Sequence, residues 1–338
     1  MKLDAGLGGI ESAAQRAAEA EEAGFAGVFT AETGSDPFLP LLLAAEATER
    51  VDLMTAIAVA FARSPMTTAA TANDIHRASG GRFILGLGSQ IKPHIERRFS
   101  MPWSKPAARM REFISALHAI WGCWNDGTKL DFRGDFYTHT LMTPFFNPGP
   151  NPHGRPKVYL AAVGDLMTAV AGEVTDGILV HPFTTERYLR EVTLPGLAKG
   201  AAKVGRSVEE LDVIGPVFIV TGDDDMQRQA ADGFVRNQIA FYGSTPAYRP
   251  VLELHGWGDL QTELNTLSKQ GEWVQMAALI DDEMLNTFAI VVDSPAELAP
   301  ALLKRYGDVV SRVSFYSSWN PKPDQLADII DILGSRFA

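Results

Sequence analysis

The chain has 338 residues, with 30 Lys or Arg and 41 Asp or Glu, so its formal net charge is −11. An apolar content of 46% and a charged content of 21% are typical of a globular protein and argue against a disordered chain. The acidic balance argues against nucleic-acid binding, because the longest basic run is Arg97-Arg98 and phosphate backbones require clustered cations.

A single cysteine, Cys123, excludes an internal disulfide framework and a cysteine-rich metal site. The first residues contain neither an apolar signal core nor an Arg-rich transit pattern. The apolar stretch 38–45 is far too short to span a bilayer. We therefore expect a soluble cytoplasmic protein that has no metal site and no membrane partner.

Apolar and amphipathic segments alternate along the chain. We expect strands at residues 2–7, 25–31, 51–61, 82–88, 156–162, 175–181, 211–222 and 312–316. We expect helices at residues 11–24, 36–49, 65–79, 106–121, 164–174, 185–204, 224–241, 295–306 and 323–335. Asp36 and Pro37 are expected as the N-cap and first residue of the second helix. Eight strand–helix units predict an α/β fold, a (β/α)8 TIM barrel. The alternative is an open doubly wound sheet, which even spacing and the lack of a dinucleotide fingerprint disfavour.

Two segments interrupt this repeat within what we expect to be one domain spanning residues 1–338. Residues 128–155 predict a hairpin followed by a long Pro/Gly-rich loop, and residues 243–285 predict an irregular insertion with helical character. Several aromatic and polar side chains on these insertions could cover a site, pack the insertion or form a dimer contact: Tyr137, His139, Met142, Phe241, Tyr242 and Tyr248.

Ligands bind TIM barrels at the carboxyl ends of the strands, so the residues at those positions are candidates. Glu32 follows the second strand and could be a general acid or base, or could pair with Arg63 at the rim. His181 ends the sixth strand and is the best candidate for proton handling. Gly164 opens a strand-to-helix turn that could bind phosphate, although a simple tight turn explains it better from the sequence alone. GLGSQI at 86–91 lacks the third glycine of a dinucleotide loop.

Two long segments resemble a known family. ERVDLMTAIAVAFARSPMTTAATANDIHRASGGRFILGLGSQ (49–90) and AAVGDLMTAVAGEVTDGILVHP (161–182) are similar to the signature regions of bacterial luciferase-like flavin and deazaflavin oxidoreductases. DPFLPL (36–41) and AFARSP (60–65) are closest to the branch that uses coenzyme F420. The resemblance spans roughly residues 2–220 and 287–335 and implies the same TIM barrel.

The resemblance implies a cofactor, F420 or alternatively FMN, at the C-terminal mouth of the barrel. A bulge with a non-proline cis peptide at Thr55-Ala56-Ile57, next to Ala58, would back its ring system. Further cofactor contacts would come from Gly88, Ser89, Gln90 and His94, and from backbone donors of Ala162, Val163 and Gly164 near its phosphate. Because the chain is acidic, a few local cations such as Arg63 or Lys92 would have to help hold this polyanion.

The chain departs from the family where many deazaflavin-dependent relatives have an acidic residue followed by His. Here the pair is Glu32-Thr33, and a Thr hydroxyl is a poor acid or base at neutral pH. We expect an F420-dependent oxidoreductase that transfers a hydride to or from a small organic substrate, with Glu32 and His181 handling the proton and Thr33 positioning. The alternatives are an FMN-dependent monooxygenase and a non-catalytic flavin or deazaflavin carrier. A homodimer is expected by resemblance.

Overall fold

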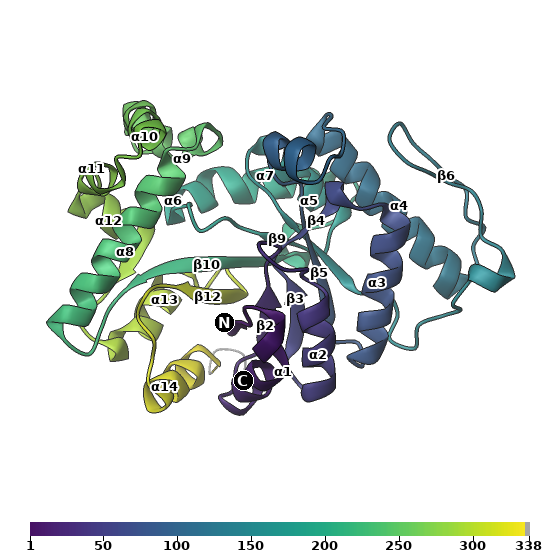
Figure 1. The fold of residues 1–338 in the computed structure, drawn as a ribbon, viewed down its shortest axis with the longest axis horizontal. Coiled ribbons are helices and arrows are strands. Elements are labelled where there is room, and N and C mark those ends of the chain that lie inside the picture. The colour runs from purple at the N-terminus through teal and green to yellow at the C-terminus, as the bar shows by residue number, and fades with distance from the viewer. Residues whose placement is uncertain (335–338) are drawn as a thin grey trace.

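Eight parallel strands form a closed barrel in the computed structural model, which describes residues 1–334 (Figure 1). The barrel strands are β1 (Lys2–Gly6), β2 (Gly27–Thr30), β3 (Asp52–Thr55), β5 (Phe83–Gly88), β8 (Lys157–Ala161), β9 (Gly177–Leu179), β10 (Asp212–Val220) and β12 (Arg312–Tyr316). Neighbouring strands pair in this order, and β12 pairs with β1 to close the ring. The (β/α)8 prediction is confirmed.

Helices connect the strands and cover the outside of the barrel. They are α1 (Ala13–Glu22), α2 (Leu39–Ala47), α3 (Pro65–Ala78), α4 (Pro106–Asp126), α5 (Asp165–Val174), α6 (Glu186–Tyr188), α7 (Leu194–Ala202), α8 (Asp225–Gly243), α13 (Leu298–Tyr306) and α14 (Pro323–Gly334). Every residue of β5 is buried, as expected for a strand with helices on one side and the barrel interior on the other. The interior is filled by a layer of five side chains, namely Met54, Ile84, Tyr159, Leu179 and Ile214.

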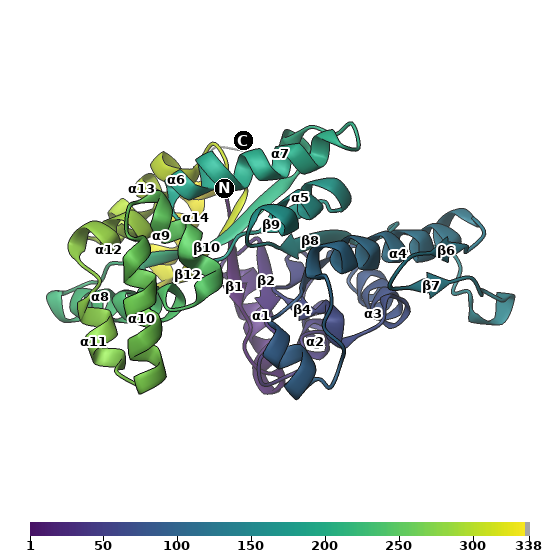
Figure 2. The ribbon, with the colours of Figure 1, turned by 90° about the horizontal axis from the view of Figure 1, so that it is seen from above.

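The two insertions lie on opposite sides of the barrel in both views (Figures 1 and 2). The first contains a short antiparallel hairpin of β6 (Phe132–Arg133) and β7 (Thr138–His139). The second contributes α9 (Arg249–Leu254), α10 (Gly258–Gln270), α11 (Trp273–Ala278) and α12 (Asp282–Phe288). These four helices and α8 share a separate hydrophobic cluster, so the second insertion packs as a small helical unit beside the barrel.

Several elements differ from those expected. The helix predicted at 185–204 is divided into α6, a π-helical segment at Leu189–Thr193 and α7. The strand predicted at 51–61 is divided, because a cis peptide joins Ala56 and Ile57 and the chain resumes as β4 (Ala58–Val59). Helix α2 begins at Leu39 and not directly after Asp36. The Asp36 carboxylate accepts hydrogen bonds from the backbone N–H groups of Phe38 and Leu39. Helix α4 continues to Asp126, and a short strand β11 (Ala289–Val291), absent from the prediction, pairs with β10 outside the barrel.

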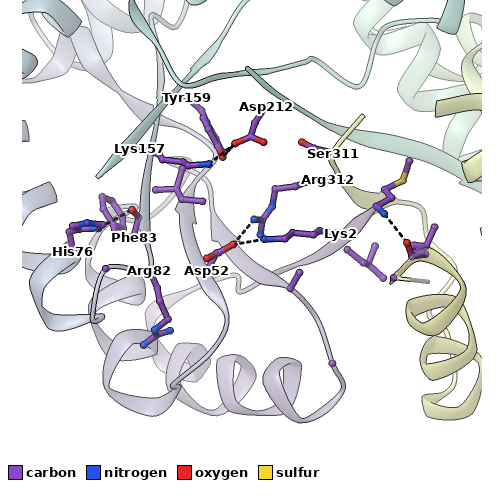
Figure 3. Close-up of a pocket in the computed structure, with 18 of the residues that line it drawn as sticks. Lys2, Asp52, His76, Arg82, Phe83, Lys157, Tyr159, Asp212, Ser311 and Arg312 are labelled. Atoms are coloured by element: carbon purple, nitrogen blue, oxygen red, sulfur yellow. Dashed lines mark hydrogen bonds and ion pairs between the residues drawn. The ribbon is translucent and has the colours of Figure 1, made fainter. Parts of the chain in front are cut away.

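The amino-terminal end of the barrel holds a network of ion pairs (Figure 3). The Arg312 guanidinium donates to both oxygens of the buried Asp4 carboxylate at 2.6 and 2.9 Å and to Asp52 at 2.5 Å. Arg312 and Asp52 line a cavity of about 640 Å³ at this end. Lys2 lies 3.6 Å from Asp52, so two cations balance the two carboxylates. We assign this network a structural role, at the face where TIM barrels concentrate stability. No helix among residues 1–334 is long and apolar enough to cross a membrane.

Candidate active site

A second cavity, of about 660 Å³, lies at the carboxyl ends of the strands. Its size is in the range of pockets that hold a small ligand together with a cofactor ring. Its walls come from all eight barrel strands or the loops after them and from the second insertion. The lining residues used below are Asp4, Ala56, Ile57, Gly88, Ser89, Gln90, Lys92, Trp103, Ala162, Val163, His181, Tyr242 and Tyr248.

The Ala56–Ile57 segment forms one wall of this cavity and carries the cis peptide that the family resemblance implies. Its backbone is held by β2: the Ala56 N–H donates to the Thr30 carbonyl at 2.7 Å, and the Ile57 carbonyl accepts from the Glu32 N–H at 3.1 Å. A Cβ on Gly88 would lie 2.8 Å from the end of the Ile57 side chain, so a larger residue at this position would have to displace that side chain.

Glu32 is buried beside this wall and is not among the residues that line the cavity. Its carboxylate accepts hydrogen bonds from the Val59 N–H at 2.7 Å and from the Arg63 guanidinium at 2.6 Å. Arg63 also donates to Asp36 at 3.2 Å. Of the two readings that the sequence left open for Glu32, the geometry therefore matches the pairing with Arg63. Arg63 is consequently occupied and does not face the cavity as a local cation.

The other predicted site residues divide into two groups. Eight of the fourteen line the cavity: Ala56, Ile57, Gly88, Ser89, Gln90, Ala162, Val163 and His181. Besides Glu32, five lie outside that lining. Thr55 and Ala58 are fully buried, and the Thr55 hydroxyl donates to the Gly86 carbonyl at 2.8 Å. Thr33 and His94 are exposed, and the Thr33 carbonyl accepts from Arg98. Gly164 borders a small adjoining cavity.

His181 follows β9 and lies between Tyr242 of α8 and Tyr248 of the second insertion. Its ring stacks on Tyr248 at 4.4 Å and meets Tyr242 edge-on at 4.7 Å between centroids. Its Nδ1 accepts a hydrogen bond from the Phe183 N–H at 3.0 Å, so in the neutral ring the proton is on Nε2. Burial lowers the pKa of His181 to about 4. At neutral pH His181 therefore supplies a hydrogen-bond donor and is a poor general base.

The turn from β8 into α5 borders the cavity and provides backbone donors. Gly164 adopts φ +78° at the N-cap, and no side chain there caps the first N–H groups of α5. Ala162 and Val163 line both the main cavity and the small adjoining one that reaches Gly164 and Asp165. Free N–H groups at a helix N-terminus favour an anion, whereas the Asp165 carboxylate in the first turn opposes one.

These features fit a flat cofactor with an anionic tail. The Ala56–Ile57 wall is apolar, the α5 turn offers N–H donors, and Lys92 adds a cation at the rim. No group of His, Cys, Asp or Glu side chains within residues 1–334 is arranged to hold a metal ion. The apolar wall and the N–H donors of the α5 turn are the features that suit an organic cofactor.

Several lining residues were not singled out from the sequence as cofactor contacts. Trp103 comes from the loop before α4, Tyr242 from the end of α8, and Tyr248 from the second insertion. For the two tyrosines, covering a site was one of three interpretations left open by the sequence. Phe241, the neighbour of Tyr242, is instead half exposed and packs against Trp273. A helix pattern alone could not tell Tyr242 from Phe241, because which ring faces the barrel depends on how the insertion docks.

Comparisons with known proteins agree with this architecture. A family model described as luciferase-like monooxygenase matches residues 2–312. An uncharacterised Mycobacterium tuberculosis protein is 56% identical over 319 residues, which cover 93% of this chain and 92% of that protein. Another M. tuberculosis protein, provisionally named a coenzyme F420-dependent oxidoreductase, is 30% identical over 298 residues, or 83% of each chain. The structure of the F420-dependent tetrahydromethanopterin reductase from Methanopyrus kandleri superimposes with a TM-score of 0.80 at 20% identity, covering 100% of this chain and 99% of that one. The chain therefore belongs to the luciferase-like monooxygenase family.

Proposed function

We propose that the chain is a coenzyme F420-dependent oxidoreductase that transfers a hydride between the deazaflavin and a small organic substrate. The observation that carries this proposal is the apolar Ala56–Ile57 wall, which packs closely against Gly88 of β5 and lines the 660 Å³ cavity. The similarity to a protein with an F420-dependent name supports the same cofactor.

F420 would supply the carbon that donates or accepts the hydride, and the chain would supply binding and orientation. Ala56 and Ile57 would support the ring system from one side, and Gly88 to Gln90 would line its edge. The Val163–Gly164 turn and the first turn of α5 would donate to the phosphate. His181 would donate its Nε2 hydrogen to a carbonyl oxygen of the substrate or the cofactor.

Aromatic side chains line the cavity and would shield a bound cofactor ring and substrate from water. They are Trp103, Tyr242 and Tyr248. Electrostatic interactions strengthen where water is excluded, so the His181 donor would polarise a substrate oxygen more strongly than the same group in solvent.

A second candidate is an FMN-dependent monooxygenase, which the name of the matching family model favours. Oxygen dependence separates the two functions, because hydride transfer to an organic substrate needs no oxygen. The purified protein should consume reduced F420 anaerobically with an accepted ketone, enone or imine. Turnover that requires FMN, a flavin reductant and oxygen would favour the monooxygenase. Binding of F420 without turnover of any of these substrate types would favour a non-catalytic carrier.

A further inference from the structure

The inside of the active-site cavity carries no free charge among the described residues. Of the side chains that line it, Asp4 and Lys92 are charged. The Asp4 carboxylate is paired with the Arg312 guanidinium, which donates hydrogen bonds to it at 2.6 and 2.9 Å. The Lys92 side chain is 61% exposed at the rim and lies 3.8 Å from Glu96. A charged group of a substrate would therefore lose its hydration inside the cavity without gaining an ionic partner, which is costly.

Neutral polar groups converge on one side of the same cavity. His181 offers the Nε2 hydrogen, because its Nδ1 is occupied by the Phe183 N–H at 3.0 Å. Tyr242 packs edge-on against the His181 ring at 4.7 Å and also lines the cavity. Tyr242 lies on α8 and His181 follows β9, so the packing of α8 against the barrel brings the two residues together.

Tyr242 belongs to a chain of three hydrogen-bonding side chains. Its hydroxyl lies 2.9 Å from the Tyr316 hydroxyl, and the Tyr316 hydroxyl donates to Gln238 Oε1 at 2.9 Å. A phenol has one proton, and Tyr316 gives its own to Gln238, so Tyr242 donates to Tyr316 and keeps a lone pair available. Rotating the Gln238 amide by half a turn presents its NH2 group to Tyr316 and reverses the direction of both bonds.

This reversible chain matches both forms of an alcohol–carbonyl couple. An alcohol hydroxyl can donate to the lone pair of Tyr242, whereas a carbonyl oxygen can accept from Tyr242 after the chain has reversed. His181 donates to the oxygen in either form. Glu32, the side chain first expected to handle the proton, is held by Val59 and Arg63 and does not line the cavity.

We propose that the site oxidises or reduces a neutral alcohol–carbonyl couple whose oxygen lies between His181 Nε2 and the Tyr242 hydroxyl. This inference rests on the proposed F420-dependent function. In the oxidising direction the alcohol carbon gives a hydride, two electrons and a proton, to the oxidised cofactor. The hydroxyl proton passes to Tyr242, and the proton of Tyr242 passes to Tyr316. The half-buried Tyr316 releases its own proton to solvent water, because the Gln238 amide orients the Tyr316 hydroxyl but cannot take up its proton. The reducing direction reverses each transfer.

A matched pair of substrates tests the substrate class. Cyclohexanone and 4-oxocyclohexanecarboxylate present the same ketone without and with a charge. With reduced F420, the protein should turn over cyclohexanone with a kcat/KM at least 100-fold higher. Equal turnover of the two ketones, or turnover of the carboxylate alone, would overturn the proposal. Failure of F420 to bind would instead remove the proposed function, which a separate binding titration with the wild-type protein detects.

Tyr242→Phe and Tyr316→Phe test the chain. Both keep the ring, and Tyr306→Phe is a control that removes a tyrosine hydroxyl from a residue outside the cavity lining. We expect Tyr242→Phe to lower kcat about 100-fold, a size usual for loss of a proton-transfer group, with F420 affinity unchanged. Tyr316→Phe should lower kcat less and change its solvent deuterium isotope effect. A kcat within twofold of the control in both variants would overturn the role of the chain.

An infrared measurement tests the same geometry without turnover. ¹³C-labelled cyclohexanone bound with oxidised F420 should show a carbonyl stretch shifted to lower frequency by the two donors. The shift should shrink in Tyr242→Phe and again when His181→Asn is added. An unshifted carbonyl in the wild-type complex, or a shift that Tyr242→Phe leaves intact, would contradict the assignment.

Discussion

The Glu32 carboxylate accepts a 2.6 Å hydrogen bond from the Arg63 guanidinium inside the barrel rim. The same carboxylate accepts from the Val59 N–H at 2.7 Å and thus ties the segment after β3 to the end of β2. The acid that the sequence suggested for proton handling therefore supports the wall of the cavity.

Replacing Glu32 tests this supporting role. Glu32→Gln keeps an acceptor for Val59 but removes the charge that Arg63 faces, so the free energy of unfolding should fall by about 2 kcal/mol. Hydride transfer should remain within a few-fold of wild type when assayed below the unfolding transition. Urea denaturation and steady-state kinetics measure the two effects. Unchanged stability with a 1,000-fold loss of kcat would instead identify Glu32 as a catalytic acid.

His181 predicts a dependence of stability on pH. Its pKa of about 4 in the folded chain lies below the ordinary value of 6.5, because burial disfavours the charged ring. As the pH is lowered, the unfolded chain takes up this proton at a higher pH than the folded chain does. The free energy of unfolding therefore falls between about pH 6.5 and about pH 4, by up to about 3 kcal/mol.

His181→Asn should flatten this part of the stability curve, since an Asn oxygen can accept from the Phe183 N–H as Nδ1 does. His118, whose pKa is also lowered to about 4 by burial, contributes in the same window and remains in the variant. Urea unfolding at several pH values between 7.5 and 4 gives the comparison. Equal slopes for the variant and the wild type would show that His181 does not titrate as described.

The close packing of Gly86 against Thr55 predicts that a larger residue at this position of β5 destabilises the fold. A Cβ at this position would lie 1.8 Å from the Thr55 carbonyl oxygen, and the Thr55 hydroxyl bonds both polar backbone groups of Gly86. Gly86→Ala should therefore lower the free energy of unfolding by more than about 2 kcal/mol and weaken F420 binding about tenfold. Gly34→Ala is the control, because nothing lies within 4 Å of its Cβ. Similar stability of the two variants would contradict this packing.

Arg312 predicts the cost of breaking the network at the opposite end of the barrel. Arg312→Leu leaves the Asp4 carboxylate buried without its cation, so we expect a loss of about 3–5 kcal/mol in the free energy of unfolding. Asp4→Leu combined with Arg312→Leu should recover part of that loss. Thermal and urea unfolding measure both variants. If the double variant lost as much stability as Asp4→Leu and Arg312→Leu lose together when each is measured alone, the two residues would not be coupled.

The fold was predictable from the sequence because its signals are local. Segments such as RFILGLG, wholly apolar apart from its first Arg, mark buried strands, and glycines or polar residues separate them from the helices. Boundaries that depend on contacts distant in the chain were less accurate. The 51–61 run is continuous in hydrophobicity, yet it divides at Ala56–Ile57, where β2 holds the backbone.

The candidate site was predictable only where backbone position decides it. Positions after β5 and β8 line the cavity as expected, because strand ends in a barrel converge. Side-chain partners were harder to predict. The Glu32–Arg63 pair, 31 residues apart, was one of two interpretations left open, and the contact of Tyr242 with Tyr316, 74 residues apart, was not predicted. Such pairs depend on the completed packing of the barrel and the second insertion.

The most direct test of the account is a binding titration with F420 and, separately, with FMN, followed by tryptophan fluorescence. Trp103 lines the cavity, so a cofactor bound there should quench its emission. The account predicts saturable quenching by F420 that FMN does not displace, with a smaller amplitude in Trp103→Phe. Saturable binding of FMN with no response to F420 would contradict it.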